Sequence, residues 1–462
     1  MGKQLFSEFD AVSAKQWKQQ IQMDLKGADY NDTLVWESLE GLHIKPFYHA
    51  EDLAELPLFS TGRIAWKIGQ RIVVEDPLKA NTRALDALAR GAQSLFFSIP
   101  RIELAVGSLF DGINLTKIPV HLEFGFLDAS AITGLLGSLP ANSLVCLHID
   151  LIGNLNRSGN WYHDMAQDHA HFDAILAHCE RQGITHVIGC DMTQYQHAGA
   201  NCIQQLAYGV AHANEYLNHL KGLNKTADPI SFQVAVGSNY FFEIAKLRAL
   251  RWLWQSVSKV HGNSVPCHIV AQPSLRNKTL YDYNVNMLRT TSEFMASAFG
   301  GADTICSLRY DHLYHHDNEF GDRIARNQLI ILQKESFLAS ASTHSDGAYY
   351  IETLTHQLAQ KGLDLFKQIE QGGGFLQQLK KGMIQKKIKA SAQKEQQLFD
   401  EGKLVSIGTN KYPNASDAMG HDLERDPFMA SRKTKTIVEP IIAKRLAETI
   451  EKERLANETK KT

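Results

Sequence analysis

The feature that most constrains this chain is a series of eight short apolar runs, rich in β-branched residues, between about residues 60 and 340. Stretches of helical pattern separate them, and the runs lack the polar alternation of half-exposed strands, which is typical of strands buried on both faces of a parallel sheet. Eight such strands separated by helices predict an α/β fold of the (β/α)8 TIM-barrel type, and the even spacing of the early units favours this fold over a doubly wound open sheet. The predicted strands are residues 70–76, 94–99, 118–124, 143–150, 185–191, 231–237, 265–272 and 304–308.

Two segments of different character flank the predicted barrel, which we place at residues 56–400. Residues 1–55 form an N-terminal arm with helical spacing at 17–25 and a strand-like stretch that turns at Gly41. The arm is rich in aromatic side chains, which are unfavourable in water, so it is expected to dock on the body or on another chain. Residues 401–462 are predicted to be a linker followed by a charged helix with one narrow apolar stripe, so that the C-terminal extension is helical.

Charge and cysteine usage exclude several classes of function. The chain has 48 Lys and Arg against 50 Asp and Glu, so it offers no global field to nucleic acid or to a membrane surface. The six cysteines form no C-x-x-C pair, which argues against a zinc site or a disulfide scaffold and favours the reduced thiols of a cytoplasmic protein. No apolar run approaches the ~18 residues of a membrane span, and the first residues lack the pattern of a secretory signal.

Several polar clusters could carry chemistry, although each also has a plain structural interpretation. Asp and Gly residues end many of the predicted strands, where they could face an active-site mouth or simply begin turns and cap helices. The histidine-rich stretches 163–171 and 311–317 could contact a metal or another ligand, but solvated loops are more common, and we predict no metal site. Cys190 and Cys306 lie in apolar runs without a neighbouring base, which favours buried, inert thiols.

The turn and helix at residues 237–254 contain the sequence Asn239-Tyr-Phe-Phe-Glu-Ile-Ala-Lys-Leu-Arg248, which resembles a signature segment of the cobalamin-dependent methylmalonyl-CoA mutase family. Further segments resemble this family in the same order along the chain, so chance does not explain the matches. The resemblance implies a (β/α)8 barrel that threads an acyl-CoA through its axis, with a separate cobalamin-binding domain above it. The other matching segments are Asp24-Leu-Lys-Gly-Ala-Asp-Tyr30, Glu40-Gly-Leu-His-Ile-Lys-Pro-Phe-Tyr48, Ala198-Gly-Ala200, Asn286-Met-Leu-Arg-Thr290, Arg323-Ile-Ala-Arg-Asn327, Tyr349-Tyr-Ile-Glu352 and Ile407-Gly-Thr-Asn-Lys-Tyr412.

The residues that the family uses for chemistry have changed in this chain. The resemblance implies a radical rearrangement of an acyl-CoA, with a Tyr-His pair at the substrate carbonyl. Thr193 and Gln194 stand at that pair, and a neutral amide cannot act as a general acid. No catalytic residue is therefore expected. The other positions of a degenerate pocket are Thr61 near a family Tyr, Gln70 retained together with Trp66, His268 and Gln272 in place of an Arg-Thr-His-Ser-Gln segment, and Cys306 in place of a His.

The cofactor signature has changed as well. The cobalamin motif D-x-H-x-x-G does not occur in the sequence, and no cobalamin-binding domain is expected within the 462 residues. The chain thus resembles the small, non-catalytic subunits of heterodimeric methylmalonyl-CoA mutases, although those subunits often keep a degenerate copy of that domain. The resemblance implies a homologous large catalytic subunit as partner, adenosylcobalamin bound by that partner, and isomerase activity of the complex, which interconverts methylmalonyl-CoA and succinyl-CoA. The N-terminal arm is the expected interface.

Two other functions fit the same resemblance. One is a working acyl-CoA mutase barrel that takes its cobalamin domain in trans, which would require a retained pocket. The other is a barrel that binds an acyl-CoA as a regulatory ligand, which would require ligand-dependent stabilisation of the isolated chain.

Overall fold

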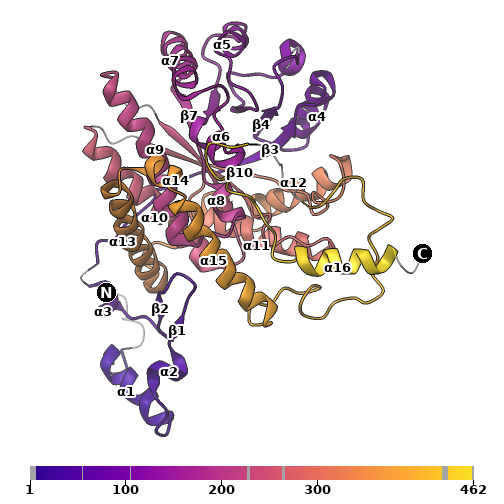
Figure 1. The fold of residues 1–462 in the computed structure, drawn as a ribbon. Coiled ribbons are helices and arrows are strands. Elements are labelled where there is room, and N and C mark those ends of the chain that lie inside the picture. The colour runs from indigo at the N-terminus through magenta and orange to yellow at the C-terminus, as the bar shows by residue number, and fades with distance from the viewer. Residues whose placement is uncertain are drawn as a thin grey trace.

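The computed structural model describes residues 7–459 except 55, 105, 226–228, 263–265 and 429–434. Eight parallel strands close into a barrel in the order β10-β3-β4-β5-β6-β7-β8-β9, with helices around it (Figure 1). The predicted (β/α)8 fold is confirmed. The barrel strands are β3 (Lys67–Val73), β4 (Ser94–Ile99), β5 (Val120–Phe124), β6 (Val145–Ile149), β7 (His186–Asp191), β8 (Ile230–Val236), β9 (Cys267–Pro273) and β10 (Thr304–Cys306).

Every predicted run overlaps a barrel strand, but the first prediction, residues 70–76, was wrong by about three residues. Strand β3 ends at Val73, because Asp76 caps the next helix, α4 (Pro77–Ala89). The Asp76 carboxylate accepts hydrogen bonds of 2.9 and 3.0 Å from two backbone N–H groups of the first helical turn. Val265, where the seventh run was predicted to begin, lies outside the described residues.

The helices surround the barrel and hide the outer faces of its strands (Figure 1). Among the described helices, none combines the length and the apolar composition of a membrane span. The helices that follow α4 are α5 (Ala129–Gly137), α6 (Leu151–Ser158), α7 (Met165–Gln182), α8 (Thr193–His197), α9 (Cys202–Gly222), α10 (Tyr240–Val260), α11 (Val285–Phe299), α12 (Glu319–Lys334), α13 (Tyr349–Gln371), α14 (Phe375–Lys380), α15 (Met383–Asp400) and α16 (Glu448–Thr459).

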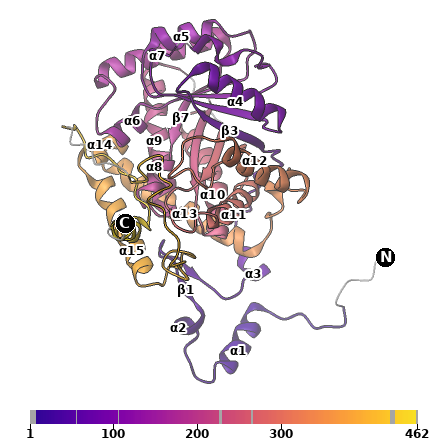
Figure 2. The same cartoon turned by 90° about the vertical axis from the view of Figure 1, so that its right-hand side faces the viewer.

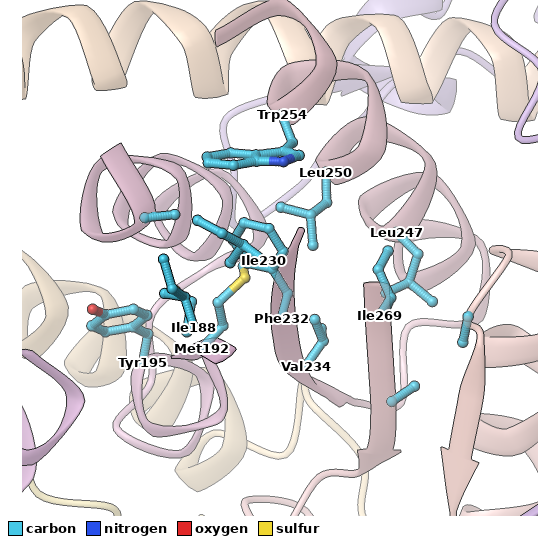
Figure 3. Close-up of a cluster of buried hydrophobic side chains, with 14 of the residues drawn as sticks. Ile188, Met192, Tyr195, Ile230, Phe232, Val234, Leu247, Leu250, Trp254 and Ile269 are labelled. Atoms are coloured by element: carbon cyan, nitrogen blue, oxygen red, sulfur yellow. The ribbon is translucent and has the colours of Figure 1, made fainter. Parts of the chain in front are cut away.

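Strand β8 illustrates why the apolar runs lack alternation: both of its faces are buried. Ile230, Phe232 and Val234 point outward toward the helices (Figure 3). The Phe232 ring packs edge-on against Trp254 of α10, with centroids 5.3 Å apart. The residues between them face the barrel interior, since strand side chains alternate. Inward positions are buried as well, including Gln233, which is only 4% exposed, so burial does not alternate along the strand.

The N-terminal arm divides into a docked and a projecting part. The hairpin of β1 (Trp36–Glu37) and β2 (His43–Ile44) turns at Gly41, as predicted, and the Gly41 carbonyl accepts a 2.6 Å hydrogen bond from Lys361 of α13. The short helix α3 (Ala50–Leu53) follows the hairpin.

The two helices before the hairpin, α1 (Ala14–Asp24) and α2 (Tyr30–Leu34), extend away from the barrel in both views (Figures 1 and 2). Trp17 and Met23 on α1 are 50% and 73% exposed.

The C-terminal extension docks along the mouth of the barrel, the side where the carboxyl ends of the strands lie (Figure 1). Backbone N–H groups of Ile441, Lys444 and Leu446 donate hydrogen bonds of 2.7–3.0 Å to carbonyl oxygens in segments that follow β6, β7 and β9. This stretch, which we call the C-terminal strap (residues 437–447), leads into α16.

Candidate functional site

The upper part of the barrel interior is organised around Arg71, which enters it from β3. The Arg71 guanidinium donates hydrogen bonds to Glu123 at 2.5 Å, Gln272 at 3.0 Å and Gln233 at 3.3 Å. It also lies 4.2 Å from the ring centroid of Phe96. These partners belong to β5, β9, β8 and β4, so one side chain connects five strands across the barrel axis. Although burial acts to raise it, the ion pair with Arg71 lowers the pKa of Glu123 to about 2.

Below this layer, toward the amino ends of the strands, the interior is filled with imidazole rings. His121 Nδ1 lies 3.0 Å from His148 Nε2, and the His268 ring centroid lies 5.5 Å from that of His121. His186 packs edge-on against His268. Each of these four rings has one buried nitrogen without a hydrogen-bond partner among the described residues. Burial lowers the pKa of His148 to about 3 and that of His268 to about 4, so both are neutral at pH 7.

The structure places three of the seven predicted pocket positions near the mouth. Gln272 belongs to the Arg71 layer, and Thr193 and Gln194 begin α8, directly after β7. The Thr193 hydroxyl donates to the Asp191 carboxylate at 2.5 Å, and the Gln194 amide donates to the Asp191 carbonyl at 2.9 Å. Burial raises the pKa of Asp191, although the Arg157 guanidinium, 3.5 Å away, acts to lower it.

The other four predicted positions lie elsewhere. His268 is in the imidazole layer, and Cys306 packs with apolar side chains in the middle of the barrel. Gln70 faces outward and accepts a 3.1 Å hydrogen bond from Arg326 of α12. Thr61 donates a 3.4 Å hydrogen bond to a carbonyl of the segment before α13 and lies beyond the amino end of the barrel. The seven positions therefore do not form one pocket.

The seven predicted positions do not include Arg71, Glu123 and Gln233, which define the mouth. The signal that could reveal them is a polar residue inside an otherwise apolar run. Because side chains alternate along a strand, such a residue must face either a helix or the barrel axis, and three of them in one barrel can meet on that axis.

The histidine-rich stretch at residues 163–171 begins just before α7 and forms its first two turns. Asp168 is fully buried and accepts hydrogen bonds of 2.8 and 3.0 Å from the backbone N–H groups of Tyr162 and His163. Asp164 caps α7, and His171 accepts from a backbone N–H of α5. Within the described ranges, no group of three or more His, Cys, Asp or Glu side chains is arranged to hold a metal ion.

The second stretch, residues 311–317, follows β10 as expected, and its aspartates pair with Arg309. Burial raises the pKa of Cys190 and, to about 11, that of Cys306. Both thiols are therefore protonated at neutral pH and are poor nucleophiles.

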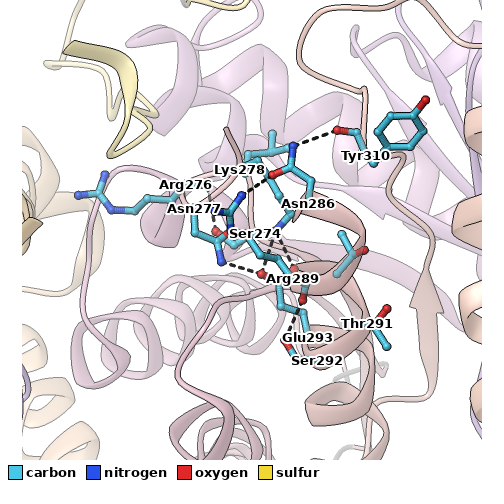
Figure 4. A network of polar contacts seen from close by, with 12 residues as sticks. Ser274, Arg276, Asn277, Lys278, Asn286, Arg289, Thr291, Ser292, Glu293 and Tyr310 are labelled. Atoms are coloured by element: carbon cyan, nitrogen blue, oxygen red, sulfur yellow. Dashed lines mark hydrogen bonds and ion pairs between the residues drawn. The ribbon is translucent and has the colours of Figure 1, made fainter. Parts of the chain in front are cut away.

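A buried polar network supports the loop that follows β9 (Figure 4). Lys278 donates to both carboxylate oxygens of Glu293 on α11 at 2.8 Å, and Asn277 donates to the same carboxylate at 2.7 Å. The Lys278 and Glu293 side chains are 3% and 0% exposed. Arg276, two residues before Lys278, reaches the C-terminal strap and donates to the carbonyl of Lys444 at 2.6 Å. The network thus fixes the position of the loop that holds the strap.

Comparison with known proteins gives one consistent result. The profile of the methylmalonyl-CoA mutase family matches residues 102–460. The chain is 31% identical to the methylmalonyl-CoA mutase small subunit of Porphyromonas gingivalis, in an alignment that covers 99% of this chain and 78% of the relative. It is 30% identical to the corresponding small subunit of Streptomyces virginiae, with 93% and 74% covered, and 26% identical to methylmalonyl-CoA mutase of Escherichia coli, with 94% and 69% covered. The profile match over most of the chain, the near-complete alignments and the closed eight-stranded barrel lead to one conclusion: the chain belongs to the methylmalonyl-CoA mutase family.

Proposed function

We propose that this chain is the small subunit of a heterodimeric, adenosylcobalamin-dependent methylmalonyl-CoA mutase and that it supports a homologous large subunit structurally. The observation that carries the proposal is the closure of the barrel axis by Arg71 and its partners. The names of the two relatives with the highest identity given above, both small subunits, support the same assignment.

An acyl-CoA that passed along this axis would have to break the Arg71–Glu123 ion pair and displace the imidazole layer below it. Separating a desolvated ion pair is costly unless the ligand replaces both partners. At the mouth, the Gln194 side chain is neutral and its amide group already donates to the Asp191 carbonyl. It cannot transfer a proton to a thioester carbonyl, so the site lacks the acid that the reaction requires.

The residues present do not fit adenosylcobalamin on this barrel. The C-terminal strap lies along the mouth, where its N–H groups are bonded to the surrounding segments, and the Arg71 layer fills the interior below. We therefore assign the cofactor to the partner subunit. We also place the complex in the cytoplasm, in keeping with six cysteines that form no disulfide.

The test is mutase turnover of methylmalonyl-CoA with adenosylcobalamin by this chain alone, by the co-expressed large subunit alone, and by the two together. We expect this chain to be inactive alone, to co-purify with the large subunit and to raise or stabilise its activity. Turnover by this chain alone would contradict the proposal, and so would a large subunit that is equally active and stable without it.

The projecting helix α1 is the part of this chain that we assign to the partner interface. Trp17 and Met23 are apolar and at least half exposed, as expected of side chains that another subunit covers. Replacing both by alanine should weaken binding of the large subunit by ten-fold or more, because aromatic anchors dominate interface energetics. Titration by light scattering or calorimetry measures the affinity.

The thermal stability of the isolated chain should not change in this variant, since exposed side chains contribute little to folding. Leu288 on α11, 72% exposed, provides the matched control, and Leu288→Ala should leave the affinity unchanged. An unaltered affinity after the double substitution would rule out α1 as an interface element.

A further inference from the structure

A cavity of about 170 Å³ lies beside the mouth and shares no residue with the Arg71 layer. Segments that follow β7, β9 and β10 form one side of it, and the C-terminal extension forms the other. Leu275, Leu313 and Phe428 contribute apolar surface. The size is comparable with that of an apolar cavity of about 150 Å³ that accommodates benzene. A ring or a short branched chain therefore fits.

Four cationic groups and two carboxylates line this cavity. Arg276 and Arg445 are buried and each is paired, with Glu395 and Glu451 respectively, at 2.6 Å. Each pair is locally neutral, so neither arginine accounts for an excess of charge.

The remaining charged groups of the lining are two cations and two carboxylates, which differ in how they are bonded. Arg425 and Lys444 make no side-chain hydrogen bond or ion pair with any residue that the structure describes. Of the two carboxylates in the lining, Asp426 accepts from the Phe428 N–H at 2.9 Å and Glu448 accepts from the backbone N–H of residue 445 at 2.8 Å. Both carboxylates are hydrogen-bonded within the C-terminal extension, whereas Arg425 and Lys444, which are exposed at the rim of the cavity, have no such partner among the described residues.

Two imidazoles, His197 and His312, also line the cavity. Burial and the neighbouring Arg309 and Arg425 lower the pKa of His312 to about 4. Burial together with Lys278 and other cationic groups lowers the pKa of His197 to about 3. At pH 7 both rings are neutral, so neither requires a counter-ion, and a ring N–H of His312 is able to donate a hydrogen bond to a bound group.

We propose that this cavity binds a small organic anion, with a carboxylate or phosphate group held by Arg425 and Lys444 and an apolar group against Leu275, Leu313 and Phe428. Small-molecule sites combine an apolar concave surface with a few polar groups that fix orientation, and this cavity has that composition. Charge-assisted hydrogen bonds to arginine and lysine are the strong interactions that such an anion can make. The proposal uses no step of the mutase reaction and goes beyond the proposed function.

The test is calorimetric titration of the full-length chain at low ionic strength with four probes. Phenyl phosphate and benzoate carry both an anionic and an apolar group, inorganic phosphate carries charge alone, and benzyl alcohol carries the ring alone. We expect saturable one-site binding of phenyl phosphate or benzoate, at least ten-fold tighter than of inorganic phosphate or benzyl alcohol. The relative affinities of the first two distinguish a phosphate site from a carboxylate site.

The double variant Arg425→Gln/Lys444→Gln should lower the affinity for the tighter-binding probe by roughly ten-fold or more, since each charge-assisted hydrogen bond contributes that much to affinity. Arg181→Gln/Lys79→Gln changes the same residue types at exposed positions on α7 and α4 and should have no effect. Benzyl alcohol binding as tightly as phenyl phosphate and benzoate would overturn the anion site, as would equal affinities in the two double variants or the absence of saturable binding by all four probes.

Discussion

Replacing Lys278 by methionine is expected to lower the free energy of unfolding by about 3–5 kcal/mol, because it leaves a buried carboxylate without its ion-pair partner. Glu293 is 0% exposed and receives two hydrogen bonds of 2.8 Å from the Lys278 ammonium. Even within the pair, burial lowers the pKa of Lys278 and raises that of Glu293, so desolvation acts against both charges. Equilibrium unfolding in urea, followed by circular dichroism, measures the loss.

Two comparisons make this result specific. Lys278→Met/Glu293→Leu should recover most of the stability, since an apolar pair of similar volume replaces the ion pair without leaving a charge behind. Lys389 also pairs with a glutamate, Glu439, but their side chains are 65% and 52% exposed, so Lys389→Met should cost well under 1 kcal/mol. A similar loss for the Lys278 and Lys389 variants would contradict the role of burial.

The single variant also has an expected pH dependence. Without Lys278, the pKa of Glu293 in the folded state lies further above its unfolded value, because the ammonium no longer opposes burial and the Asn277 hydrogen bond alone does not replace it. A raised folded pKa favours the folded state at low pH and loses that contribution as the pH rises. The difference in free energy of unfolding between wild type and Lys278→Met should therefore increase from pH 5 to pH 8.

Acid should destabilise the whole barrel well above the pH at which carboxylates are protonated. His148 and His197 have pKa values of about 3 and His268 of about 4, against an ordinary value of 6.5. A depressed folded pKa means that the unfolded chain binds protons first, so stability is complete above pH 6.5 and falls as the pH decreases toward 3–4. At pH 5 each such histidine lowers the free energy of unfolding by about 2 kcal/mol relative to neutral pH. Three of them amount to about 6 kcal/mol, a large part of the 5–15 kcal/mol typical of a folded domain.

Glu123 does not offset this loss, because its pKa of about 2 keeps it ionised throughout the window. The free energy of unfolding in urea should decline steeply from pH 7.5 through pH 6 to pH 5. In His148→Gln the decline over this range should be smaller by about 2 kcal/mol, whatever the effect of the substitution on stability at pH 7.5. His43, which is exposed in the arm, is the control, and His43→Gln should leave the slope unchanged. A slope that is the same in wild type and His148→Gln would refute the histidine origin.

Much of the fold could be predicted because it depends on local patterns. The eight apolar runs predicted eight barrel strands, and the turn at Gly41 predicted the arm hairpin. The shift in β3 shows the limit of such patterns: the run continues past Val73, but the capping of α4 by Asp76 draws the chain out of the sheet.

The candidate site could be predicted only in part. Thr193, Gln194 and Gln272 lie near the mouth, whereas Gln70 and Thr61 do not. A family resemblance locates a residue along the chain but does not say which face of a strand it occupies. Gln70 and Arg71 are neighbours in sequence, yet one faces a helix and the other the barrel axis, because successive side chains of a strand point to opposite sides.

The fold class, the order of the elements and the family follow from the linear chain, because hydrophobic periodicity and colinear segments can be read without any long-range contact. The tertiary structure alone decided what fills the barrel and what lies along its mouth. Arg71 meets residues 52, 162 and 201 positions away, and the backbone–backbone hydrogen bonds from the C-terminal strap to earlier segments span at least 170 residues, the separation of Leu446 and Arg276. Such contacts arise only when the barrel closes, since closure brings the inward faces of distant strands within hydrogen-bond distance on one axis.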